Sequence, residues 1–329
     1  MVDRKSSKRL PDRHLLNGWP LFWLLSIPVC VAMVWECLQG DLRDPHYVSH
    51  LISYSVRWSV PFIVAALAAS SLRVLFNHPW THWLLRNRKE MGLVFAVAMG
   101  WQGAFIFLVS SVHFDYYYTD IYYLRDELEG SSGYLFLAAM VLTSFKFGRQ
   151  AITPTQWRLI HKSGIYFLWA YPYSVYWWNI FYYDEPRVLD YLFYWAGFLA
   201  FAVRIAAWAK LRRQRARAVA SGHPVTSNTV HRAKIWLGYA LLAAGLAAAA
   251  TGRKWQETAS NALLAPNWSA ELELWLPYWP FQPFLPLFVL GLAALCLAPS
   301  SQPSGNTHRP MKAKKKADSV NGSDTGKVA

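Results

Sequence analysis

The sequence lacks the short motifs that mark most soluble enzymes. It has no Walker motif, no glycine-rich dinucleotide turn, no Cys-x-x-Cys pair and no zincin-type histidine pair. Nothing in it is therefore expected to bind NAD or FAD. If the chain takes part in a redox reaction, its electrons are expected to come from a separate protein or from quinol. The three cysteines, Cys30, Cys37 and Cys296, fall within apolar stretches. They predict small buried side chains, and neither a disulfide framework nor a zinc site.

Apolar and aromatic residues are abundant instead. Of 329 residues, 54% are hydrophobic, and Trp, Tyr and Phe occur 18 times each, which is typical of an integral membrane protein. Crossing about 30 Å of hydrocarbon takes roughly 20 helical residues. Eight stretches come near that length: 18–38, 51–76, 91–113, 133–148, 156–179, 188–210, 233–252 and 280–298. The predicted fold class is all-α, a polytopic membrane bundle of about eight transmembrane helices, in which the fourth segment is short and prolines interrupt the eighth.

The charge of the chain follows its expected loops. The formal net charge is +14, and Lys and Arg gather in alternate connections, while the connections between them are acidic or nearly neutral. The positive-inside rule then predicts a multi-pass membrane protein with both termini in the cytoplasm. The basic runs are expected to contact the lipid bilayer and no nucleic acid.

Four segments are expected to flank or extend the main bundle. Residues 1–16 form a basic cytoplasmic leader, followed by an apolar segment too long for a cleaved signal peptide. Residues 216–232 read as a basic cytoplasmic linker, and 233–299 as a two-helix membrane hairpin with an outer loop rich in Trp and Pro. Residues 300–329, rich in Ser, Gly, Lys and Asn, predict a disordered cytoplasmic tail.

Three signatures occur in order between residues 50 and 178. The second apolar segment ends with ASSLR (69–73), the third begins at RKEMGL (88–93), and LTS (142–144) precedes WRLIH (157–161). In this order the chain resembles the ferric reductase-like transmembrane domain family, and in particular the MsrQ type, the haem-binding membrane subunit of the bacterial methionine-sulfoxide reductase system. The resemblance implies a six-helix core over residues 17–215, placed in the bacterial inner (plasma) membrane.

In that family, histidines of the third and fifth helices hold haem iron. The resemblance places the inner pair at Gln102 and His161 and the outer pair near Tyr116 and at Ser174, so one of four positions carries histidine. His113 lies on nearly the same helix face as Gln102. It lies roughly 25 Å from His161 in depth, at about 1.5 Å per residue, so these two histidines cannot share one iron. The candidate haem contacts are therefore His161, Gln102 and His113, with no catalytic residue assigned.

Each of these residues has a simpler interpretation. His161, beside Arg158 and Lys162, suits a position near lipid headgroups, and Gln102 suits a hydrogen bond between helices. His46, His50 and His113 lie near several aspartates, so a metal site at the outer surface stays an alternative. Arg204, within an apolar segment, either extends to the membrane surface or pairs with an anionic group such as a haem propionate.

Two functions remain open at this point. The resemblance implies a transmembrane electron-transfer subunit with haem b, altered haem ligation and an outer redox partner. The ligand count favours a haem-free member with no cofactor, which would act as a membrane scaffold or as an assembly partner for a periplasmic or membrane protein. Dense aromatic runs, including Tyr171 to Tyr183, are expected to form belts at the outer membrane interface.

Overall fold

The computed structural model describes residues 16–183, 185–220 and 229–298, and in this part of the chain it contains helices and no strand. The chain order is α1 (Gly18–Gln39), α2 (Pro45–Leu75), α3 (Pro79–Arg86), α4 (Arg88–Val112), α5 (Phe114–Tyr116), η2 (Tyr117–Ile121), α6 (Leu124–Leu142), α7 (Lys146–Gln150), α8 (Pro154–Phe181), α9 (Val188–Ala220), α10 (Thr229–Ala250), α11 (Gly252–Leu264), α12 (Asn267–Trp275), η3 (Gln282–Phe284) and α13 (Leu285–Leu297). The all-α fold class is confirmed.

Five of these helices are long and apolar enough to cross a membrane: α1, α2, α4, α9 and α10. Three further expected spans also coincide with helices, but these helices differ in length or composition. α6 opens with the charged sequence LRDELE, α8 carries polar residues along its 28 positions, and α13 has 13 residues. The membrane-helix bundle is thus supported by five helices, and a count of eight goes beyond them.

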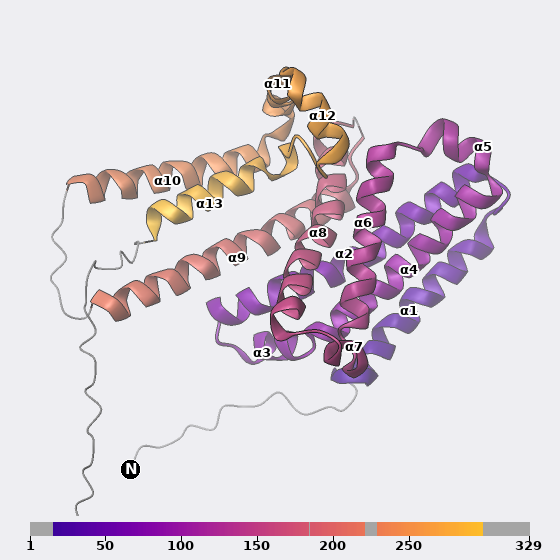
Figure 1. The fold of residues 1–329 in the computed structure, drawn as a ribbon, viewed down its shortest axis with the longest axis horizontal. Coiled ribbons are helices and arrows are strands. Elements are labelled where there is room, and N and C mark those ends of the chain that lie inside the picture. Colours follow the sequence, from indigo (N-terminus) through magenta and orange to yellow (C-terminus); the bar gives the residue numbers. More distant parts are fainter. Residues whose placement is uncertain (1–15, 184, 221–228, 299–329) are drawn as a thin grey trace, which may run out of the picture.

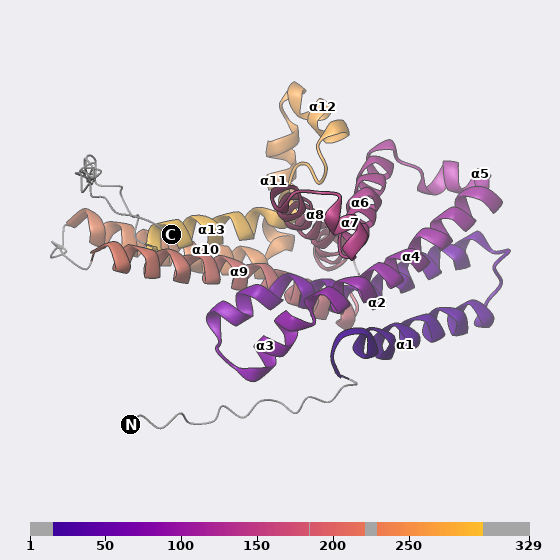
Figure 2. The ribbon, with the colours of Figure 1, turned by 60° about the horizontal axis from the view of Figure 1, so that its bottom comes forward.

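The helices form a bundle, and α10 and α13 form an arm that extends from it (Figure 1). α2 packs against α4 on one side and against α9 on another, α1 covers α4, and α6 packs on α8. α10 and α13 pack together along α9, away from α1 and α4 (Figure 2). α3 and α7 lie at one end of the bundle, called here the α7 end, and α11 and α12 lie at the other, the α12 end.

Two expected connections turn out to be partly helical. The basic linker at 216–232 is helical at both ends, because α9 continues to Ala220 and α10 begins at Thr229; Arg, Lys and Ala favour helix and extend α9 beyond its apolar part. The expected outer loop between Trp255 and Phe281 contains α12 and most of α11. The expected tail at 300–329 and all but Leu16 of the expected leader lie outside the described residues.

The expected outer aromatic belt is corrected in its second half. Tyr173, Tyr176 and Trp177 of α8 are at most 4% exposed and belong to the core of the bundle. The Tyr173 ring stacks on Trp169 at 4.8 Å and on Tyr194 at 5.5 Å. The hydroxyl of Tyr194 donates to the Ala249 carbonyl at 2.8 Å. Tyrosine is tolerated here because its ring fills the core while its hydroxyl reaches a carbonyl of the arm.

Candidate functional site

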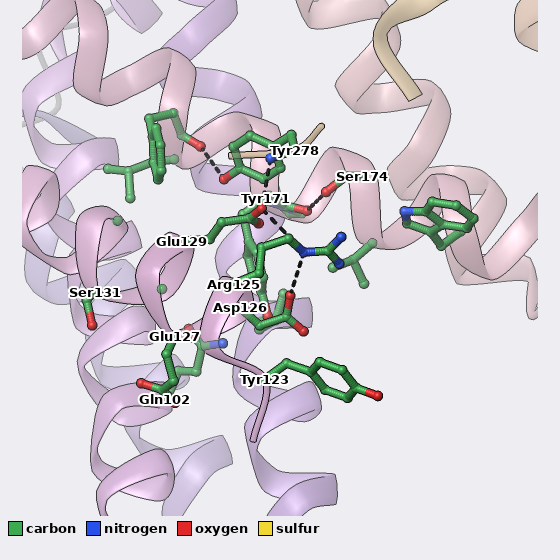
Figure 3. Close-up of a pocket in the computed structure, with 18 of the residues that line it drawn as sticks. Gln102, Tyr123, Arg125, Asp126, Glu127, Glu129, Ser131, Tyr171, Ser174 and Tyr278 are labelled. Carbon is green, nitrogen blue, oxygen red and sulfur yellow. Dashed lines mark hydrogen bonds and ion pairs between the residues drawn. The ribbon is translucent and has the colours of Figure 1, made fainter. Parts of the chain in front are cut away.

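A cavity of about 810 Å³ opens between α2, α4, α6 and α8 toward the α12 end of the bundle. Five residues of the segment that leads into α13 form part of its wall: Tyr278, Trp279, Pro280, Gln282 and Pro283. Figure 3 shows Tyr278 at the cavity. The volume lies within the range of small-molecule sites, which are largely apolar with a few placed polar groups. The cavity is therefore the candidate functional site.

Its deep wall carries a polar group from α4. Gln102 is 3% exposed, and its Oε1 accepts a hydrogen bond from the Tyr134 hydroxyl at 3.1 Å. The same hydroxyl lies 3.2 Å from the Met99 carbonyl. On α8, the Ser174 hydroxyl donates to the Tyr171 carbonyl at 2.9 Å. An amide buried among helices needs hydrogen-bond partners, and here Tyr134 supplies one.

The rim of the cavity at the start of α6 is charged. Arg125 Nε lies 3.2 Å from Asp126, and its Nη1 lies 3.2 Å from Glu273 of α12. Glu129, one turn further along α6, lies 4.0 Å from Arg125 Nε, and its Oε1 accepts the Tyr278 backbone N–H at 2.8 Å. Carboxylates in the first turns of a helix are favoured by its dipole. Burial raises the pKa of Glu129, while the hydrogen bond from Tyr278 and the nearby Arg125 lower it in part.

The structure brings together some of the expected haem positions and separates others. Gln102 and Ser174 both line the cavity. His161 does not line it; its Nε2 lies 3.0 Å from the Thr143 hydroxyl, and its ring stacks on Trp157 at 4.3 Å. His113 follows α4 near the α12 end, with its Nε2 3.0 Å from the Leu42 carbonyl.

These donors do not fit a haem held by two axial ligands. Such a haem needs two nitrogen or sulfur donors facing each other from opposite helices. The cavity positions carry an amide and a hydroxyl, each already hydrogen-bonded, while both histidines have other partners outside the cavity. The assignment of His161, Gln102 and His113 as haem contacts stays a prediction.

The alternative metal site gains no support within the described residues. No group of three or more His, Cys, Asp or Glu side chains there is arranged to hold a metal ion. His50 Nε2 instead lies 3.0 Å from Glu36, and His46 Nδ1 lies 3.3 Å from the Tyr116 hydroxyl. The outer histidines thus have separate partners.

Arg204 has a role that neither sequence interpretation gave. Its Nε donates to the Tyr166 hydroxyl at 2.9 Å, and its Nη1 donates to the Leu67 carbonyl at 2.9 Å. Its guanidinium lies over the Tyr166 ring, 4.8 Å from the ring centre. Arg204 therefore joins α9 to α8 and α2 inside the bundle.

Several cavity residues escaped the sequence analysis. Arg125 and Glu129 lie one helical turn apart just before an expected span, a signal that could have marked them. Tyr278 gave no such signal, because it reaches Glu129 from 149 residues further along the chain.

No family model, no curated protein and no solved structure matches the chain.

Proposed function

We propose that this chain is a haem-free membrane protein with a ferric reductase-like six-helix core, and that it binds a small molecule in the cavity of about 810 Å³. One observation carries the proposal. Gln102 and Ser174, at two positions where the resembling family holds haem, line one cavity, where Gln102 Oε1 and the Ser174 hydroxyl are hydrogen-bonded within the protein. This arrangement supports a ligand other than iron-bound haem in the space between α4 and α8.

The proposal includes eight membrane helices, with both termini in the cytoplasm of a bacterial cell. α6 and α8 pack on each other within the bundle, where a polar helix face can be turned toward a cavity and away from lipid. α13 is extended by η3 to give the apolar helical segment Gln282–Leu297. With this orientation, the cavity opens toward the periplasm.

A role as scaffold or assembly partner is compatible with a ligand-filled cavity. Trp268 and Trp275 of α12 are 57% and 70% exposed at the α12 end. Exposed tryptophans at this depth suit contact with lipid headgroups or with an outer protein partner. Ligand binding would then control what α12 presents to that partner.

Electron transfer through a haem b with altered ligation is the second candidate. The observation that favours it is His161, which matches a family ligand position and whose Nε2 is within hydrogen-bond distance of a single hydroxyl, that of Thr143. Turning His161 toward the interior of the bundle would break this contact, at a cost of about 1 kcal/mol.

Visible spectra separate the two candidates. We expect the full-length protein, expressed with ample haem and purified in detergent, to show no reduced b-type band above background. His161→Ala should then leave both yield and spectrum unchanged, like the exposed control His82→Ala. A sharp b-type spectrum near one haem per chain that disappears in His161→Ala alone would establish the second candidate and overturn the first.

A neutral probe tests the cavity itself. Triphenylphosphine oxide, an uncharged aromatic molecule, should bind the detergent-purified protein measurably in isothermal titration. Gly130 of α6 lines the cavity, and an added Cβ there would meet no atom within 4 Å, so Gly130→Trp should fill space and weaken binding at least fivefold. Gly100→Trp is the matched control, because Gly100 is exposed on α4 and does not line the cavity. Equal loss in both variants would mean that the probe binds elsewhere.

A further inference from the structure

The charges of the cavity lining are strongly unequal. Among the described lining residues there are four carboxylates, Asp126, Glu127, Glu129 and Glu273, and one cationic side chain, Arg125. A concave site lined by one sign of charge concentrates ligands of the opposite sign. The lining therefore disfavours an anion.

Arg125 does not neutralise these carboxylates evenly. Its guanidinium lies 3.2 Å from both Asp126 and Glu273, whose side chains are 58% and 42% exposed. Glu129, with a side chain 14% exposed, is more buried than either and lies 4.0 Å from Arg125 Nε. Arg125 thus pairs most closely with Asp126 and Glu273, the two carboxylates that are more exposed to solvent.

Glu129 has an oxygen free for a ligand. Its Oε1 accepts the Tyr278 N–H, and among the described residues no donor is within hydrogen-bond distance of Oε2. Figure 3 shows Glu129 between Arg125, Tyr171 and Tyr278 at the cavity. A largely buried carboxylate whose one counter-charge is 4.0 Å away and shared with two other carboxylates gains from a second cation, because its own hydration is incomplete.

Aromatic side chains form much of the remaining wall. Ten described lining residues carry aromatic rings, among them Phe167, Tyr171 and Tyr278. The Phe167 and Tyr278 rings lie 5.5 Å apart. Ring faces attract organic cations, and the attraction is stronger where water is excluded. Carboxylate and ring faces therefore favour the same class of ligand.

We propose that this cavity binds an amphipathic organic cation, with its positive centre near Glu129 and its apolar groups against the aromatic walls. The inference rests on the proposed function, namely that the cavity is a ligand site, and adds the class of ligand. Within this site, Glu129 provides charge selectivity and the rings provide most of the contact area.

Three aromatic probes that differ chiefly in charge test this inference. Tetraphenylphosphonium, tetraphenylborate and triphenylphosphine oxide are titrated by calorimetry into the full-length protein in detergent, and binding retained by Gly130→Trp is subtracted as micelle partitioning. We expect the phosphonium to bind at least tenfold more tightly than the neutral probe, and the borate to show no specific binding. If the phosphonium binds no more tightly than the neutral probe, the cation assignment is overturned and the ligand site remains. The same conclusion holds if the borate binds more tightly than the phosphonium. Loss of specific binding for all three probes overturns the proposed function itself.

The charge of Glu129 is tested by its amide isostere. Glu129→Gln keeps an oxygen for the Tyr278 N–H, so folding should be preserved, and thermal unfolding in detergent checks this. Phosphonium affinity should fall about tenfold, while affinity for the neutral probe stays within twofold. Glu271→Gln, an exposed carboxylate of α12 outside the lining, should change neither. Parallel losses for both probes would show that Glu129 only shapes the wall, and would contradict its role in charge selection.

Discussion

Replacing Arg204 with methionine is expected to lower the free energy of unfolding in detergent by about 3 kcal/mol. The guanidinium donates at 2.9 Å to the Tyr166 hydroxyl and at 2.9 Å to the Leu67 carbonyl. Hydrogen bonds of charged groups contribute about 1.5–3 kcal/mol each, and the contact with the Tyr166 ring adds about 1 kcal/mol. Placing a charge in a membrane helix costs roughly 2.5–3.5 kcal/mol, and the methionine variant avoids this cost. The lost interactions are larger than this gain, so the variant is expected to be less stable.

Unfolding by increasing fractions of SDS, followed by tryptophan fluorescence, measures this loss. Arg158→Met is the matched control, because Arg158 is exposed. Its Nη2 donates a long hydrogen bond of 3.5 Å to the Thr155 hydroxyl. Its effect should stay within about 0.5 kcal/mol. If both variants behave alike, Arg204 extends to the membrane surface as the sequence alone allowed, and the contacts to α2 and α8 contribute nothing.

Trp177→Ala is expected to cost about 3–5 kcal/mol, the range for truncating a large buried aromatic side chain. Trp177 is 0% exposed and packs against Phe181 and Trp255, with ring centres 5.5 and 6.0 Å away. Lipid tails are as apolar as the bundle interior, so little of this cost comes from the hydrophobic effect. The loss comes from the cavity and from the contacts that the indole ring makes on every side.

Trp177→Phe sharpens this experiment. The indole Nε1 is buried and, among the described residues, has no hydrogen-bond partner. Phenylalanine removes this unpaired donor, which relieves about 1–3 kcal/mol and offsets part of the lost volume, so the variant should lose less than about 2 kcal/mol. Trp275→Ala, at a position 70% exposed, should lose less than either, by the same unfolding assay. A Phe variant as damaged as the Ala variant would mean that a bound water or ligand satisfies Nε1.

The sequence was most informative where a helix is apolar all round. α1 and α4 were predicted within three residues of their ends, because their segments have few charges and clear polar borders. α6 was placed too late by nine residues at its start, since its first turns are charged and resemble a loop. α12 was missed altogether, because a short helix beside prolines has no membrane-length signal.

The candidate site was less predictable for a physical reason. The sequence marked Gln102 as a polar residue in a helix interior, and the structure gives it the partner between helices that this required. Periodicity could not show that Tyr171 faces the cavity while Tyr173 lies in the core, because both sit in one aromatic run of α8. Helix rotation is fixed by neighbouring helices, and those neighbours are distant in sequence.

The contact between Glu129 and Tyr278 also has a consequence for biosynthesis. Tyr278 follows Glu129 by 149 residues, so at roughly 5–20 residues per second a ribosome delivers it about 7–30 s later. For most of that interval α6 and α8 are already synthesised, while their carboxylate and tyrosines still lack one wall of the cavity. A chain interrupted before Tyr278 would present these polar groups to lipid or to the insertion machinery. Synthesis of the segment before α13 thus closes the cavity last, and a truncated chain would leave these polar groups without that wall.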